Sequence, residues 1–110
     1  MITLIRTDIF AAWLDELRDK KAKARILSRL DLAVLGNFGD CESIGEGVSE
    51  MRMHYGPGYR IYYMRRADKT YLLLAGGDKS TQTRDVKRAK QLARDLKQQD
   101  SRKKRSPKTR

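Results

Sequence analysis

The feature that most constrains the fold is a change in residues 48–75 from helical spacing to alternation of polar and apolar side chains. In the run Glu50-Met51-Arg52-Met53-His54-Tyr55, every second side chain is polar, as in a strand with one face against a core. Gly56-Pro57-Gly58 then supplies a turn, and residues 59–65 are rich in aromatic and β-branched side chains. The pattern predicts a β-hairpin, followed by a mostly apolar strand at residues 70–75 that is covered on both faces or lies centrally in the sheet.

The segments on either side of these strands have other spacings. Ile2–Arg6 predicts a short strand that stops at Thr7-Asp8, where either side chain can cap a helix. Apolar residues recur every three or four positions over 10–17 and again over 22–34, and the second run ends at Gly36. Turn residues crowd positions 37–47 and predict a loop of about ten residues. A third helix is predicted from about residue 86 to 97.

Together these elements predict one α+β domain over residues 1–98. An N-terminal helical hairpin would pack on a three- to four-stranded antiparallel sheet, with a C-terminal helix after it. Residues 99–110 are predicted to form a basic flexible tail, because they bring too little apolar surface to offset the entropy of ordering them.

The chain is strongly basic, with a net charge of +11, and residues 1–100 keep +5 of it without the six cations that follow. Such a charge favours a polyanion or an acidic protein as partner. No apolar run reaches the roughly 18 residues of a membrane span, and no secretion signal opens the chain, so we expect a cytoplasmic protein. Cys41 and His54 are the only cysteine and histidine, so neither a disulfide nor a structural zinc site is predicted, and we expect no metal or cofactor.

The polar side of the predicted hairpin carries residues that suit RNA chemistry. Glu50, Arg52 and His54 share one face of their strand, and Arg60 and Tyr62 join them if the register sets them opposite Arg52 and His54. Arginine binds phosphate oxygens, tyrosine stacks on bases, and cleavage of RNA by its own 2′-hydroxyl needs charge stabilisation and proton transfer rather than a metal. Either His54 or Glu50 can take the proton.

Simpler interpretations of the same residues stay open. Alternating charge also suits a solvated sheet face, and a single histidine on a strand can be structural. Trp13 and Phe10 are expected in the core. The glycines, Lys79 and hydroxyls before the third helix can hold a phosphate, but their spacing differs from that of a P-loop, which disfavours nucleotide hydrolysis. Ser80 or Thr81 can equally be a helix cap.

Three motifs resemble those of a known family. The sequence is similar, over about residues 3–97, to the phage-related, HigB-type branch of the RelE/ParE toxins, also called addiction module killer proteins. The motifs that carry the resemblance are GNFGD (36–40), GEGVSEMRMHYGPGYRIYY (45–63) and LLAGGDKSTQTRD (73–85). The resemblance implies a compact α+β fold with two helices against an antiparallel sheet.

The resemblance also implies roles for single residues. Arg60, in the GYR motif, stands where RelE-like toxins keep an arginine that stabilises the scissile phosphate. Arg52 and His54 fall on the strand that supplies basic side chains, and Lys79 is the basic residue after the last strand. The chain departs from RelE in having no tyrosine beyond Tyr71, so Tyr62 or His54 would have to take that role.

Members of this superfamily have two activities on one fold, and fold alone does not distinguish them. RelE-like toxins cleave mRNA in the ribosomal A site, whereas ParE-like toxins poison DNA gyrase. The resemblance implies a ribosome-dependent mRNA endoribonuclease held inactive by an antitoxin, often one with a helix-turn-helix domain, of the HigA kind. DNA would then be contacted only through the antitoxin complex. A gyrase inhibitor, or a chain that acts mainly by antitoxin binding and operon co-repression, is the alternative.

Overall fold

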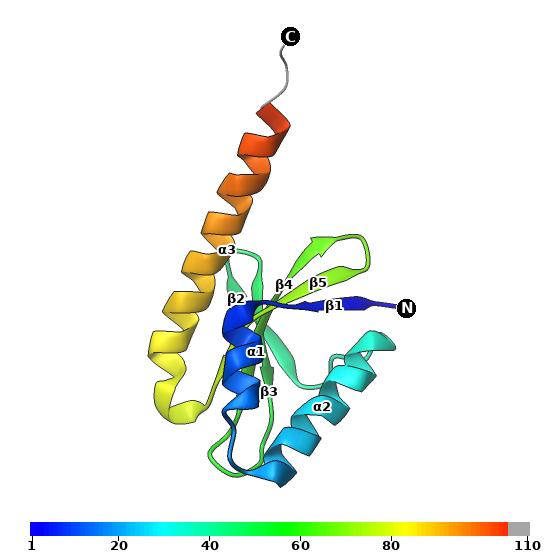
Figure 1. Cartoon of the computed structure of the whole chain (residues 1–110), viewed down its shortest axis with the longest axis vertical. Helices are drawn as coiled ribbons and strands as arrows, with labels where there is room; N and C mark the ends of the chain where they lie inside the picture. The colour runs from blue at the N-terminus through cyan, green and yellow to red at the C-terminus, as the bar shows by residue number, and fades with distance from the viewer. Residues whose placement is uncertain (106–110) are drawn as a thin grey trace.

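The computed structural model describes residues 1–105, with side chains through Ser101. A five-stranded sheet forms its centre, with helices on both faces (Figure 1). The helices are α1 (Asp8–Asp15), α2 (Lys20–Val34), the single 3₁₀ turn η1 (Lys79–Thr81) and α3 (Gln82–Arg105). The strands are β1 (Thr3–Arg6), β2 (Cys41–Gly45), β3 (Val48–Arg52), β4 (Arg60–Ala67) and β5 (Thr70–Gly77).

The sheet is mixed, in the order β1-β5-β4-β3-β2. Strands β2 to β5 form an antiparallel meander, and β1 pairs in parallel with β5, with Thr3 beside Thr70. The α+β class is confirmed, but the expectation of three or four antiparallel strands is wrong in two respects. The loop predicted at 37–47 contains β2, and the N-terminal strand joins the sheet in parallel. The central position of β5 is as predicted, because β1 and β4 flank it.

Two hydrophobic clusters lie on opposite faces of the sheet. Side chains such as Ile61 and Tyr63 pack under α1 and α2 with Phe10, Leu14 and Ile26. Their neighbours on β4, Tyr62 and Met64, point the other way and pack under α3 with Ala89 and Ala93. The two core faces explain why β4 is continuously buried from Arg60 to Met64. The N-terminal helices and α3 therefore enclose the sheet from both sides.

Side-chain caps mark the starts of both N-terminal helices, and the cap at Thr7 was predicted. The Thr7 hydroxyl accepts a hydrogen bond from Phe10 N and caps α1, while Asp19 caps α2 through Lys21 N and Ala22 N. Gly36 follows α2 with φ 97°, as predicted for a residue in the left-handed region after a helix.

Helix α3 is longer than its apolar spacing predicts. It runs to Arg105 and extends beyond the edge of the sheet (Figure 1), so residues 99–105, which were predicted to belong to the flexible tail, are helical. The rest of the predicted tail lies outside the described residues. Within the described part of the chain, no helix combines the length and apolar character that a bilayer crossing requires.

Candidate functional site

A pocket of about 380 Å³ lies at one end of the sheet, between the β3–β4 turn and the start of η1. We call it the turn pocket; it is lined by His54, Tyr55, Gly56, Pro57, Gly58, Arg60 and Lys79. All three charged or ionisable nitrogen side chains that line it, those of His54, Arg60 and Lys79, can carry positive charge, and no carboxylate lines it. All three are among the six residues that the sequence predicted for one candidate site.

Backbone contacts bring these segments together. Gly58 adopts φ 78°, which lets the turn after β3 fold back towards η1. There Pro57 O accepts a hydrogen bond of 3.3 Å from Lys79 N. A Cβ added at Gly58 would lie 3.5 Å from Lys79 Cβ and 3.9 Å from Arg60 Nη1, so all three residues meet at this corner. The Gly-Pro-Gly turn thus places the lysine that follows β5 beside the first residue of β4.

The Arg60 guanidinium is the most unusual group in this pocket. Its side chain is only 9% exposed, yet Nε and Nη1 have no hydrogen-bond partner among the described residues. The nearest carboxylate oxygen is Glu50 Oε2, 3.8 Å from Nε, which is an ion pair without a hydrogen bond. Buried donors are nearly always satisfied, so a cation with free donors at a pocket wall is typical of an anion-binding site.

Glu50 and Tyr62 lie deeper than the sequence indicated. The two residues are register partners on β3 and β4 and are covered by the start of α3. The Glu50 carboxylate accepts a 2.8 Å hydrogen bond from Gln82 Nε2. Tyr62 is fully buried, and its hydroxyl has no hydrogen-bond partner among the described residues. Burial first, and then the nearby Glu50 carboxylate, raise the pKa of Tyr62 far above its ordinary value. Neither residue lines the turn pocket.

Arg52 is also outside the pocket, although it is paired with Arg60 across the hairpin. Its guanidinium reaches the other way, with Nη2 3.0 Å from Asp40 Oδ1 and Nη1 2.6 Å from Glu42 Oε1. Two carboxylates therefore neutralise it. The register differs from the one considered in the sequence, since Tyr62 lies opposite Glu50 and His54 follows the end of β3.

His54 is exposed and held by the same carboxylate. Its Nε2 lies 2.7 Å from Asp40 Oδ2. The hydrogen bond from His54, followed by that from Arg52, lowers the pKa of the Asp40 carboxyl below its ordinary value. Asp40 thus stays ionised and orients the imidazole ring at the rim of the turn pocket. Asp40 was not predicted as a site residue, although it ends the GNFGD motif, because it lies 14 residues before the histidine it holds.

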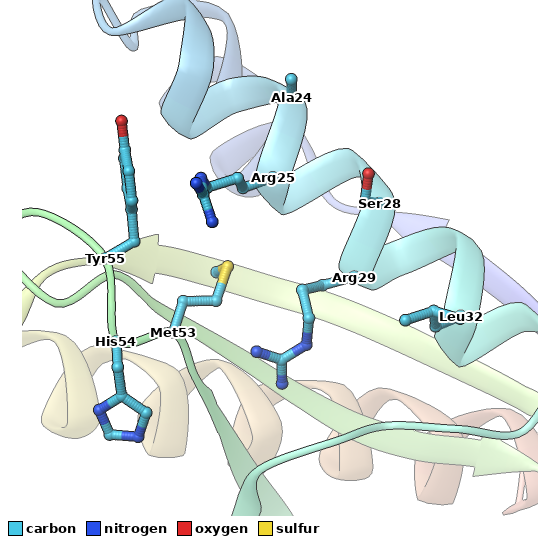
Figure 2. A pocket seen from close by; sticks show the side chains of 8 residues that line it. All are labelled: Ala24, Arg25, Ser28, Arg29, Leu32, Met53, His54 and Tyr55. Carbon is cyan, nitrogen blue, oxygen red and sulfur yellow. The ribbon is translucent and has the colours of Figure 1, made fainter.

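A second cavity adjoins the first (Figure 2). This α2 groove has a volume of about 460 Å³ and shares His54 and Tyr55 with the turn pocket. It is lined by Ala24, Arg25, Ser28, Arg29, Leu32, Met53, His54 and Tyr55. The Arg25 guanidinium lies 4.3 Å from the centroid of the Tyr55 ring. Arg29 is structural, because it donates to the carbonyls of Arg52, Phe38 and Asp40.

Of the six residues singled out from the sequence, the structure brings His54, Arg60 and Lys79 to one pocket. Glu50 and Tyr62 lie beneath α3, and Arg52 is paired with acids. Tyr55 and Arg25 escaped sequence reasoning, since Tyr55 falls on the apolar side of the strand pattern and Arg25 on an ordinary polar helix face. Their proximity is a tertiary contact between segments 30 residues apart, and no local pattern signals it.

Fold and site thus define a small basic α+β protein with a cationic, carboxylate-free pocket at the end of its sheet. Residues 12–98 match the family described as phage derived protein Gp49-like (DUF891), and the chain belongs to that family. This family is toxin-like, of the RelE/HigB type, which agrees with the resemblance at this level. The chain is also 43% identical over 97 residues to an uncharacterized protein of Haemophilus influenzae, covering 87% of this chain and 98% of that protein.

Proposed function

We propose that this protein is the toxin of a toxin–antitoxin pair and cleaves mRNA on the ribosome without a metal. The observation that carries the proposal is the nearly buried Arg60 guanidinium, which lines a pocket with Lys79 and His54 and whose Nε and Nη1 have no hydrogen-bond partner among the described residues. A phosphodiester suits this pocket, because its anionic oxygens would match the positive charge of these side chains. Membership of a toxin-like family supports the same assignment.

The chemistry that suits these groups is attack by the ribose 2′-hydroxyl on the adjacent phosphorus. The O2′–P bond forms, the P–O5′ bond breaks, and the products are a 2′,3′-cyclic phosphate and a 5′-hydroxyl. Arg60 would stabilise the extra negative charge on the phosphorus oxygens in the transition state. Lys79, which also lines the pocket, would stabilise the departing 5′-oxygen, and that oxygen takes a proton from solvent water to leave as a hydroxyl.

His54 is the best-placed group to accept the 2′-hydroxyl proton. It is exposed at the pocket, and Asp40 holds one of its ring nitrogens, which leaves the other available. Glu50, the other candidate, is 3% exposed and already bonded to Gln82. Tyr62 is fully buried, so His54 rather than Tyr62 would replace the C-terminal tyrosine of RelE.

The test is cleavage of a defined mRNA in a purified translation system. Arg60→Ala should lower the cleavage rate by about 100-fold or more, the usual effect of removing one transition-state donor. Arg65→Ala is the matched control, because Arg65 lies on the same strand, is exposed and pairs only with the nearby Asp68 among described acids. Intact mRNA at protein concentrations that stop growth would refute the nuclease proposal.

Gyrase inhibition is the competing activity, and a supercoiling assay distinguishes it. We expect neither inhibition nor trapped DNA cleavage with this protein. If supercoiling is inhibited while mRNA stays intact, the chain is ParE-like in activity.

The expected partners are a ribosome and a cognate antitoxin of the helix-turn-helix, HigA-like kind. Net charge supports both, since +11 favours association with rRNA and with an acidic protein segment. We propose that the antitoxin covers the turn pocket or displaces an element beside it. Copurification with the product of the neighbouring gene at low and high salt tests the pairing, and failure at both would count against it.

A further inference from the structure

The α2 groove is a second cavity that the cleavage chemistry does not use. It opens beside the turn pocket and is joined to it by two shared residues, His54 and Tyr55. Among the described residues no carboxylate lines either cavity, and the basic residues of the α2 groove are Arg25, Arg29 and His54. A chain that enters the turn pocket through a phosphate can therefore continue into the groove without meeting negative charge on its walls.

The α2 groove has apolar and aromatic walls, which suit a nucleobase better than the basic walls of the turn pocket do. Met53, Leu32 and Ala24 give it apolar surface, and Tyr55 adds an aromatic ring at the end nearest the turn pocket (Figure 2). Arg25 extends from α2 towards that ring and lies over its face, 4.3 Å from the centroid. The groove thus has a flat, stacked end and an apolar floor.

Arg25 is available for a further partner. It is exposed, and it makes no hydrogen bond or ion pair with any side chain through Ser101. Its guanidinium lies over the Tyr55 ring, and both side chains line the groove. Guanidinium planes and tyrosine rings are the surfaces on which proteins stack unpaired bases.

From these features we infer that the α2 groove binds a nucleobase adjacent to the phosphate in the turn pocket. The base stacks on the Arg25–Tyr55 pair, above Met53, and the ligand is single-stranded RNA. This inference rests on the proposed function for the identity of the phosphate. It adds a stacking subsite, built by α2 and the end of β3, that selects unpaired nucleotides. A base still paired in a duplex cannot enter, because its stacking faces are covered by its neighbours.

A binding assay tests the subsite directly. The probe is a fluorescent single-stranded RNA hexamer with 2′-O-methyl riboses, which cannot be cleaved through the 2′-hydroxyl, together with a set of hexamers that lack one base each. Tyr55→Leu and Arg25→Gln should weaken binding of the intact hexamer by about tenfold, as expected for loss of one stacked base. Tyr55→Phe keeps the ring and should bind like the unmodified protein.

Two comparisons separate stacking from general charge and from misfolding. Lys21→Gln removes the same charge as Arg25→Gln from an exposed position of α2 outside the groove, and should weaken binding by no more than about twofold. For the hexamer that lacks the critical base, Tyr55→Leu should bind as well as the unmodified protein. Thermal unfolding of each variant confirms that the fold is retained.

The outcomes distinguish this subsite from the proposed function. In one outcome, Arg60→Ala abolishes mRNA cleavage, but Tyr55→Leu and Arg25→Gln bind every hexamer with the same affinity as Lys21→Gln. The nuclease proposal then stands and the subsite is refuted. If mRNA is not cleaved but binding still depends on one base and on Tyr55, the subsite stands and the nuclease proposal fails. Absence of binding by the unmodified protein at millimolar hexamer would also refute the subsite, because the groove is open in the free protein.

Discussion

The pairing of Arg60 with Glu50 leads to a prediction about stability that opposes the one about activity. Two buried Arg60 donors lack partners, and each costs about 1–3 kcal/mol of folding free energy. The attraction to Glu50 at 3.8 Å returns about 4 kcal/mol at an effective dielectric constant of about 20. The two effects nearly cancel, so the guanidinium contributes little net stability although it is almost fully buried.

Substitutions at both positions make this balance measurable. Arg60→Met alone should destabilise the fold by about 1–3 kcal/mol, because it leaves the buried Glu50 carboxylate with only Gln82 as partner. In the double variant Glu50→Gln/Arg60→Met both charges of this pair are removed, and the amide at position 50 can still accept a hydrogen bond from Gln82. We expect the double variant to be more stable than Arg60→Met by about 1–3 kcal/mol and at least as stable as the unmodified protein.

Urea denaturation of the unmodified protein, of Glu50→Gln and Arg60→Met alone, and of the double variant gives these differences in the free energy of unfolding. A difference of 1 kcal/mol corresponds to roughly 4 °C in Tm for a domain of this size. The double variant should nevertheless be inactive towards mRNA. The reasoning would be refuted if it were no more stable than Arg60→Met, since Arg60 would then be a satisfied structural residue rather than a cation held ready for an anion.

Three further predictions concern other parts of the fold. Thr7→Ala removes the cap of α1 and should cost about 1–2 kcal/mol by urea denaturation, whereas Thr7→Ser should be close to neutral. A Cβ at Gly77 would collide with the Asp85 carboxylate, so Gly77→Ala should cost more than about 3 kcal/mol, while Gly36→Ala, with open space around it, should cost about 1 kcal/mol. The pKa of Asp40 is lower in the folded protein than in the unfolded chain, so the ionised carboxylate stabilises the fold at pH values above its unfolded pKa. This stabilisation is lost as the pH falls through the pKa of the folded state. Asp40→Asn should therefore lose less stability than the unmodified protein between pH 6 and pH 3. An equal acid loss in both proteins would contradict this.

The elements that periodicity predicted correctly are those with a strong apolar face. Helices α1 and α2 and strands β4 and β5 each bury several side chains, so their spacing shows in the sequence. Strand β2 is an exposed edge strand that ends in glycine, and its polar composition resembles that of a loop. The parallel pairing of β1 depends on residues almost 70 positions away, and local spacing carries no information about it.

The part of the site that could be predicted follows from the alternation of side chains along the strands and from the family motifs. Arg60 and Lys79 were found in this way, and His54 by its titration chemistry. The alternation of Glu50 and Arg52 correctly placed them on one face, but it could not show what covers that face. Helix α3 buries Glu50, and β2 brings acids to Arg52; both effects are tertiary.

The parallel pairing of β1 with β5 has a consequence for how the protein is made. Its partner, residues 70–77, comes much later in the chain, and Thr3 lies beside Thr70. The long segment between them must be closed into a loop before these two strands meet, and contacts of such long range slow folding. Arg60 and Lys79 also come together only after β5 is complete. A nascent chain is therefore expected to lack the turn pocket until Lys79 has left the ribosome, which leaves a period in which a waiting partner can bind the chain before it becomes competent.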